Sequence, residues 1–203
     1  MQRTTHIMNI EAIRERARQH MERGAVTESY GADRDVAIQL LNDALATELV
    51  CVLRYKRHYF MASGIHAEAA AAEFSEHAAE EQEHADRIAA RIVQLGGEPD
   101  FSPHELVRRS HSEYVEGRDL IEMIRENLVA ERIAIESYTE MVRFFGTKDP
   151  TSRVLIESIL ATEEEHADDM SSLLQGVLPP EQPTRGTQSS AGRTSAKARG
   201  AQA

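Results

Sequence analysis

Glu81-Gln82-Glu83-His84 is followed later in the chain by a near repeat, Glu163-Glu164-Glu165-His166. In each stretch a glutamate and a histidine stand three residues apart, so on a helix the carboxylate and the imidazole leave from one face. With 25 glutamates and 9 histidines in the chain, chance alone gives roughly one such pair, and a solvated charged face is its commoner explanation. The meaning of each pair therefore depends on the residues around it.

Apolar residues at helical spacing surround both pairs. The stripe that holds Glu81 and His84 also holds Phe74, Ala78, Ala85, Ile88 and Ile92. The stripe that holds Glu163 and His166 also holds Ile156, Ile159, Leu160, Ala167, Met170 and Leu174. Because such a stripe faces the core of a bundle, we expect both pairs to point inward. The neighbouring glutamates, Glu80, Glu83, Glu164 and Glu165, are left for the flanks and solvent.

Two further glutamates each interrupt an apolar stripe. Glu48 lies among Leu41, Leu45, Val52 and Tyr55, and Glu131 lies among Ile124, Leu128, Ile135 and Tyr138. Glu48 precedes Glu81 by 33 residues and Glu131 precedes Glu163 by 32, so a helical hairpin brings each pair to one height. Four inward carboxylates would cost several kcal/mol each if ionised and unpaired, so they must be protonated, paired or neutralised by metal.

Helical periodicity and Gly/Pro breaks predict an all-α chain. Long helices are expected over residues 36–62, 67–95, 118–145 and 150–175, after a short leading helix over 9–21. The connection over 96–117, with one helical turn at 104–109, is longer than an antiparallel hairpin requires. We therefore predict a ferritin-like four-helix bundle with one long crossover between the second and third long helices.

This interpretation divides the chain into three segments. Residues 1–35 form an N-terminal extension that contains the short helix, and residues 36–176 form the bundle. Residues 177–203 are poor in apolar side chains and form a tail that we expect to be disordered.

Composition limits the classes of function. A single cysteine, Cys51, with neither a leader nor an apolar stretch of about 20 residues, predicts a cytoplasmic protein without a membrane segment. The net charge is −11, divided into −14 over residues 1–180 and +3 over the tail. The body should attract cations and repel nucleic acid, and four positive side chains on the tail give only a weak attraction to DNA.

Di-iron and di-manganese carboxylate bundles share one ligand set. Two of their helices each supply a glutamate, and the other two each supply a Glu-x-x-His motif. We therefore predict six metal ligands: Glu48, Glu81, His84, Glu131, Glu163 and His166. Mixed oxygen and imidazole ligands suit Fe(II), and open coordination positions would let O₂ or H₂O₂ take electrons from two irons.

At these residues the sequence resembles bacterioferritins and the related Dps-like ferritins over about 36–175. Residues 41–49 with Tyr55 are similar to the first helix of that family, and residues 81–87 through the Leu95-Gly96-Gly97 end are similar to the second. The resemblance implies two iron ions per subunit. It implies that Glu48 and the first Glu-x-x-His bind one iron, that Glu131 and the second bind the other, and that Glu81 and Glu163 bridge. It also implies an iron-storage protein with ferroxidase activity that oxidises Fe(II) with O₂ or H₂O₂ and keeps the mineral in an oligomeric shell.

Two departures from the family refine these expectations. Bacterioferritins bind haem through a methionine immediately after the first bridging glutamate, and here that position is Gln82, so we expect no haem. They also carry a fifth helix, whereas Pro179, Pro180 and a polar tail follow here, which favours a dodecamer over a shell of 24 subunits.

Three side chains near the ligands have alternative interpretations. Tyr55 can hydrogen-bond a ligand carboxylate, donate an electron or simply fill the core. His77 can support or supplement the ligands, or be a satisfied core or interface histidine. Cys51 can sense peroxide or serve as a small packing residue.

Other functions use the same pattern. A rubrerythrin-like di-iron peroxidase or a di-manganese catalase would turn over H₂O₂ without accumulating mineral. A metal-free helical interaction protein, in which the inward glutamates are interface residues, would purify without metal.

Truncation after Gly176 should leave both the oligomer and its oxidase activity intact. The removed residues lack the apolar stripe that a packed fifth helix requires, and Pro179-Pro180 removes two backbone donors. Light scattering coupled to size exclusion compares the two lengths of chain. Dissociation of the shorter chain would show that the tail is an assembly element, whereas loss of DNA retention alone at low salt would revive DNA binding.

Overall fold

The computed structural model describes residues 8–65 and 67–178, and within them all regular structure is helical. Four long helices are present: α2 (Arg34–Met61), α3 (Ala67–Gln94), α5 (Leu120–Phe145) and α6 (Pro150–Val177). Shorter elements are α1 (Ile10–Arg16), the 3₁₀ turn η1 (Met21–Arg23) and α4 (Leu106–Arg109). The prediction of an all-α bundle with four long helices is confirmed.

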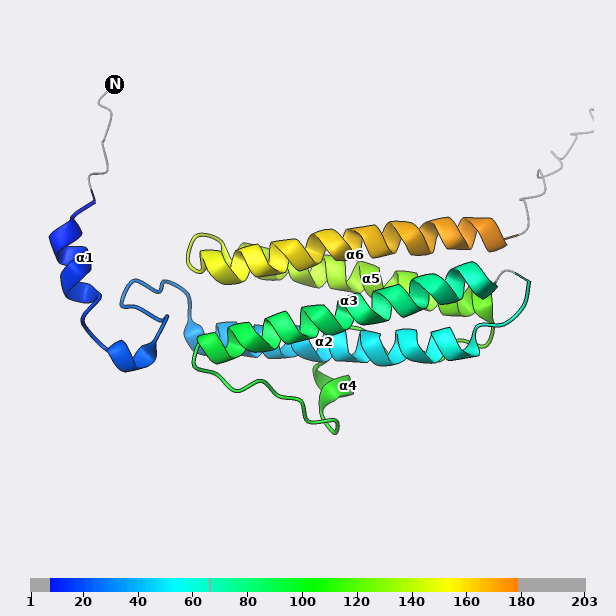
Figure 1. Cartoon of the computed structure of the whole chain (residues 1–203), viewed down its shortest axis with the longest axis horizontal. Coiled ribbons are helices and arrows are strands. Elements are labelled where there is room, and N and C mark those ends of the chain that lie inside the picture. Colours follow the sequence, from blue (N-terminus) through cyan, green and yellow to red (C-terminus); the bar gives the residue numbers. More distant parts are fainter. Residues whose placement is uncertain (1–7, 66, 179–203) are drawn as a thin grey trace, which may run out of the picture.

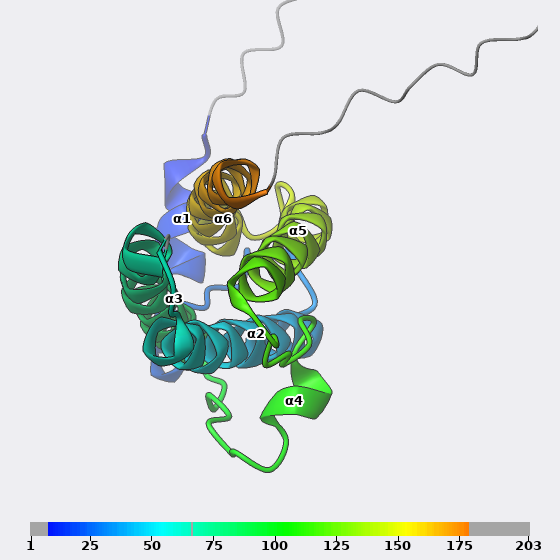
Figure 2. The same cartoon turned by 90° about the vertical axis from the view of Figure 1, so that its right-hand side faces the viewer.

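The long helices form two hairpins that lie side by side. Helix α2 packs mainly against α3, and α5 packs mainly against α6, while α2–α5 and α3–α6 contacts join the two hairpins. The connection from α3 to α5 runs back along α2 and carries α4 (Figure 1). Viewed along their axes, the four helices surround a common centre (Figure 2). The crossover therefore lies where the sequence predicted it, and it makes α3 and α5 run in the same direction (Figure 1).

Local signals set the helix ends. Asp33, Asp119 and Asp149 each cap a long helix, since the side chain accepts a hydrogen bond from a backbone N–H in the first turn. At the end of α3, Gly96 has a positive φ of 78° and the Gly97 N–H bonds back to the Ile92 carbonyl at 2.9 Å. A Cβ on Gly97 would lie 2.8 Å from Cγ2 of Ile38, so this turn also needs a glycine for its close approach to α2.

The bundle interior holds two apolar clusters with a polar layer between them, and a third, small cluster joins Ala46 and Val50 of α2 to Leu106 of α4. The first includes Leu41, Leu45, Ile88, Ile92, Phe145, Ile156 and Ile159. The second includes Tyr55, Phe74, Met123, Ile124 and Met170. On every long helix the predicted ligands fall between the residues of one cluster and those of the other. The fold thus places six polar side chains at mid-height between the two apolar clusters.

Helix α2 corrects one expectation. It is the only helix among the described residues that is long and apolar enough to cross a membrane by length and composition, although the sequence had indicated no such stretch. More than half of that apolar window is buried inside the bundle. Its composition is therefore explained by its place in the core, on the side facing both clusters.

The segment before the bundle is less regular than predicted. The leading helix ends at Arg16 rather than near Met21, and none of its residues is buried. Ile10 and Ile13 are exposed, and α1 stands apart from the bundle (Figure 1). A short helix without a packed face gains little beyond its own hydrogen bonds, which explains why it stops early.

The C-terminal boundary also shifts. Helix α6 continues to Val177, and this residue packs against the second apolar cluster. The disordered tail was predicted from residue 177, but Val177 belongs to α6, and residues 179–203 of that tail lie outside the described residues. The three-segment division of the chain remains a prediction.

Asp149 connects three parts of the fold at one end of the bundle. It caps α6 through the Ser152 N–H at 2.9 Å and accepts hydrogen bonds from Arg91 Nη2 at 2.8 Å and the Tyr30 hydroxyl at 2.9 Å. Both Asp149 and the Arg91 guanidinium are buried. Removing one partner of such a pair leaves the other charge without compensation.

Asp149→Ala should lower the free energy of unfolding by about 3 kcal/mol or more, because it removes a cap and isolates the buried Arg91. Asp33→Ala is the matched control: it removes an exposed cap of the same residue type and should cost about 1 kcal/mol. Urea unfolding followed by circular dichroism measures both. Equal losses in the two variants would show that the buried ion pair contributes nothing.

Candidate metal centre

The structure brings all six predicted ligands together in the polar layer. Helix α2 supplies Glu48, α3 supplies Glu81 and His84, α5 supplies Glu131, and α6 supplies Glu163 and His166. Each of these residues is at most 3% exposed. Periodicity thus predicted the inward direction correctly for every one of them.

The six side chains form two overlapping groups of four. Ligand atoms of Glu48, Glu81, His84 and Glu163 lie within 4.8 Å of one another, and so do those of Glu81, Glu131, Glu163 and His166. Glu81 and Glu163 belong to both groups. Nδ1 of His84 lies 3.1 Å from Glu163 Oε1 and 3.4 Å from Glu48 Oε2. Nδ1 of His166 lies 3.6 Å from Glu81 Oε1 and from Glu163 Oε2.

Many atoms of this layer lack a protein partner. Among the described residues, twelve buried side-chain nitrogen or oxygen atoms make no hydrogen bond, and eight of the twelve belong to the six predicted ligands. They are Glu48 Oε2, both oxygens of Glu81, His84 Nδ1, Glu131 Oε2, both oxygens of Glu163 and His166 Nδ1. Unpartnered polar atoms are costly in a core. Converging carboxylate oxygens and imidazole nitrogens of this kind fit two divalent cations.

The two carboxylates that belong to only one group are each held by a tyrosine. The Tyr55 hydroxyl donates to Glu131 Oε1, and the Tyr138 hydroxyl donates to Glu48 Oε1. Burial, and then the adjacent carboxylate, raises the pKa of each tyrosine well above its ordinary value, so both remain donors. In each glutamate the second oxygen is left for a metal. Of the interpretations open for Tyr55, the hydrogen bond to a ligand carboxylate is the one that the geometry favours.

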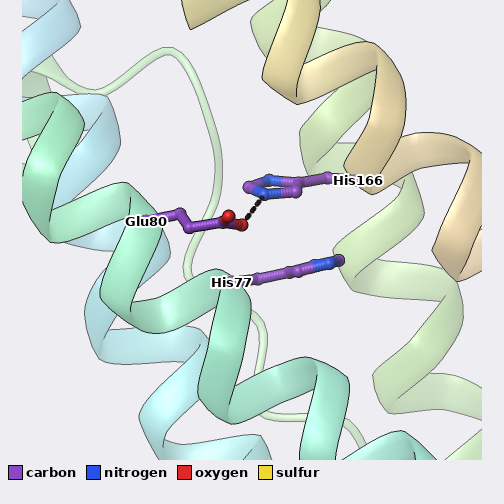
Figure 3. Close-up of side chains that lie close together, drawn as sticks. All are labelled: His77, Glu80 and His166. Carbon is purple, nitrogen blue, oxygen red and sulfur yellow. Dashed lines mark hydrogen bonds and ion pairs between the residues drawn. The ribbon is translucent and has the colours of Figure 1, made fainter.

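Glu80, which the sequence assigned to the flanks and solvent, also contacts one of the predicted ligands. Its Oε2 lies 2.7 Å from His166 Nε2, across the gap between α3 and α6 (Figure 3). An imidazole that donates from Nε2 to a carboxylate keeps Nδ1 as a basic, correctly oriented lone pair. Glu80 therefore orients His166 toward the polar layer, although its side chain is 43% exposed.

The polar layer stores protons in the absence of metal. Burial, followed by repulsion from Glu81 and Glu163, raises the pKa of Glu48 and of Glu131 well above the ordinary range. Burial alone raises the pKa of Glu81, but the adjacent Glu48 carboxyl and the imidazoles of His166 and His84 overcome this and lower it. Neutral Glu48 and Glu131 thus reduce the crowding of negative charge.

The two imidazoles carry the opposite charge. Burial alone lowers the pKa of His84, but the adjacent carboxylates of Glu163, Glu48 and Glu81 raise it to about 12. Burial also lowers the pKa of His166, but the adjacent carboxylates of Glu163 and Glu81 raise it to about 11. Without metal, both rings are therefore cationic at neutral pH, and their protons occupy the positions that a metal would take.

His77 and Cys51 differ in what they can do. His77 is buried, its Nδ1 lies 3.1 Å from the Tyr55 hydroxyl, and its ring stacks on His166 with centroids 3.8 Å apart. It therefore supports the ligand layer through Tyr55.

Burial raises the pKa of the Cys51 thiol, which accepts a hydrogen bond from Arg54 at 3.4 Å. A buried, protonated thiol is a packing residue rather than a peroxide sensor.

Sequence reasoning missed the functional contacts of Tyr138 and Glu80. Tyr138 had been identified only as an apolar-stripe residue, and its position two turns after Glu131 on the same stripe could have suggested a carboxylate partner. Glu80 gave no comparable signal, because it belongs to a run of charged residues on the outer side of α3. Its contact with His166 joins a side chain of α3 to one of α6, and the periodicity of a single helix does not reveal such contacts.

Comparisons with known proteins agree with this geometry. Residues 38–177 match the family described as "Ferritin-like domain". A DNA protection during starvation protein of Pyrococcus furiosus is 30% identical, covering 74% of this chain and 83% of its own. Bacterioferritin BfrA of Mycobacterium tuberculosis is 31% identical, covering 70% of this chain and 86% of its own.

Solved structures show the same arrangement of helices. A dodecameric thioferritin, the bacterioferritin-related protein of Bacteroides fragilis, is 32% identical with a TM-score of 0.70, over 72% of this chain and 89% of its own. Bacterioferritin of Desulfovibrio desulfuricans, solved with its diiron site in different catalytic states, is 23% identical with a TM-score of 0.63. It covers 71% of this chain and 81% of its own, and it supports the fold alone.

Binding of divalent metal should release protons and weaken as pH falls. Glu48, Glu131, His84 and His166 all have raised pKa values, so they hold protons without metal and must lose them to bind it. Affinity should therefore rise with pH, by about tenfold per pH unit for each proton released. Anaerobic calorimetric titration with Zn(II), in buffers of different ionisation enthalpy, counts the protons. Affinity that is constant between about pH 6 and about pH 8 would contradict the linkage.

Proposed function

The chain belongs to the ferritin-like domain family, and from this premise we propose that it oxidises Fe(II) at the six-residue centre and stores the ferric product. Iron storage in general is supported by the family and by relatives named bacterioferritin. The ferroxidase centre, the two irons per subunit and the six ligands are the specific content of the proposal.

One observation carries it: eight unpartnered buried atoms on six side chains, arranged as two groups of four that share Glu81 and Glu163. Two divalent ions would neutralise four carboxylates, and they would replace the protons now held by the imidazoles and by Glu48 and Glu131. In this assignment Glu81 and Glu163 bridge, Glu48 and His84 hold one ion, and Glu131 and His166 hold the other.

The protein contributes orientation, burial and charge to the chemistry. Tyr138 and Tyr55 fix the terminal carboxylates, and Glu80 fixes the ring of His166. The substrate Fe(II) supplies one electron per ion, so a pair reduces O₂ to H₂O₂ with two protons, or H₂O₂ to two waters with two protons. The four groups with raised pKa values give up their own protons when the ions bind, so they are ligands rather than proton sources in this step.

Storage requires an assembly, and we propose a homo-oligomer of twelve subunits rather than 24. The likeness to a dodecameric thioferritin at 32% identity favours this size. The net charge of −11 favours cations rather than DNA as partners, and we propose a cytoplasmic protein without bound haem. Gln82, at the position of the family's haem ligand, is exposed and donates to Asp86 at 3.0 Å.

The competing functions differ in how far the geometry supports them. An interaction protein with interfacial glutamates is disfavoured, because Glu48, Glu81, Glu131 and Glu163 are buried within a single chain. A di-iron peroxidase or di-manganese catalase would use the same ligands. Sustained consumption of H₂O₂ without mineral growth would favour those enzymes over storage.

Glu131→Ala should reduce the rate of rapid Fe(II) oxidation by about 100-fold or more, because it removes a ligand carboxylate from the centre. The helical content should be unchanged, since the apo core gains by losing a buried carboxyl group. Stopped-flow absorbance of ferric product after mixing with Fe(II) and O₂ or H₂O₂ measures the rate.

Glu136→Ala is the matched control, since it removes an exposed glutamate from the same helix. It should oxidise Fe(II) at the wild-type rate. Glu131→Gln keeps the side-chain volume and should be as slow as Glu131→Ala. Wild-type rates in both Glu131 variants would refute the assignment of the centre.

A further inference from the structure

A second cluster of metal-type ligands lies beside the centre, toward the surface. Nε2 of His77 is 3.6 Å from Glu73 Oε2 and 3.5 Å from Asp169 Oδ2. The imidazole is only 2% exposed, whereas the side chains of Glu73 and Asp169 are 37% and 53% exposed. The ligand atoms of the three lie within 4.8 Å of one another. One buried nitrogen thus faces two carboxylates that solvent can reach.

Hydrogen bonding fixes which nitrogen of His77 carries the proton when the centre holds metal. The single hydroxyl hydrogen of Tyr55 goes to Glu131. The oxygen of Tyr55 must then accept from Nδ1–H of His77, which lies 3.1 Å away. Nε2 is left as a lone pair without a hydrogen-bond donor, and it points at Glu73 and Asp169. A lone pair that faces two carboxylates is repulsive unless a cation lies between them.

The surroundings also favour a cation. Burial, and then the charges of Asp169, Glu76 and Glu80, raises the pKa of Glu73. Glu73 and Asp169 line a groove of about 710 Å³ between α3 and α6, which is open to solvent and also contains Glu68. The other residues that line the groove are mostly small or apolar, so its three carboxylates are the groups there that attract a divalent ion.

The cluster is directly connected to the proposed centre. The ring of His77 stacks on the ring of His166, whose other neighbour on this side is Glu80 (Figure 3). Ligand atoms of His77, Glu80 and His166 also lie within 4.8 Å of one another. Glu80 is thus placed between the outer cluster and the inner ligands, where it could contact an ion moving from one to the other.

We propose that Glu73, His77 and Asp169 form a third divalent-cation site, at which Fe(II) binds before it enters the centre. The binding site stands on the geometry of these three side chains. Its role as an entry point rests on the proposed ferroxidase function. Two carboxylate oxygens and one imidazole nitrogen leave positions for water, as a site that must release its ion requires.

Anaerobic titration of the full-length protein with Co(II), followed by calorimetry and visible absorbance, tests the binding site. Wild-type protein should take up about three equivalents per chain. The double variant Glu73→Gln/Asp169→Asn should take up about two, because the centre remains intact. The matched control Glu76→Gln/Asp168→Asn removes the same charge from exposed neighbours on the same two helices and should retain about three.

Fe(II) oxidation at limiting iron tests the entry role. The double variant should be roughly tenfold slower than the matched control at low Fe(II) and equal to it at saturating Fe(II). Equal rates at low iron would overturn the entry role.

Stoichiometry separates the two proposals. Uptake of no more than two equivalents by wild type, or equal uptake by the double variant and its control, would overturn the third site and leave the centre untouched. The Glu131→Gln variant should lose Co(II) from the centre and retain the outer ion. If it instead matches wild type in uptake and oxidation, the proposed function fails while the outer site stands.

Discussion

Four glutamate carboxyls buried at one level of a helical core require compensation, and this requirement organises the molecule. An isolated ionised carboxylate in an apolar interior costs several kcal/mol, so the fold must supply protons, partners or metal. Here two of the carboxyls are protonated in the metal-free state, and two imidazoles are held as cations. The result is a layer close to electrical balance whose protons can be exchanged for metal.

The supporting contacts follow from that layer. Tyr55 and Tyr138 each occupy one oxygen of a terminal carboxyl, leaving the other oxygen free. Glu80 binds the outer nitrogen of His166, so the inner nitrogen faces the layer. The apolar clusters above and below exclude water from these groups and strengthen every electrostatic interaction among them.

Sequence patterns predicted the bundle because each long helix carries an apolar stripe, and the predicted ligands interrupt these stripes at one level. The same stripes indicated the inward direction of all six proposed ligands, while their role as ligands stays a prediction. Periodicity could not predict the contact of Glu80 with His166, because that contact joins two helices and an exposed charged face looks alike with or without it. Nor could it predict how Asp149, Arg91 and Tyr30 meet, since they come from three distant segments. The length of α1 was overestimated because local propensity was not supported by any packed surface.

The division of the ligands between the hairpins has a mechanical consequence. Helices α2 and α3 provide three of the six, α5 and α6 provide the other three, and the chain between the hairpins is a long crossover. Metal in the layer would therefore link the α2–α3 hairpin to the α5–α6 hairpin. Metal binding would stabilise the contact between the two hairpins, and metal release would weaken it. Metal binding and local opening of the bundle would then be thermodynamically linked.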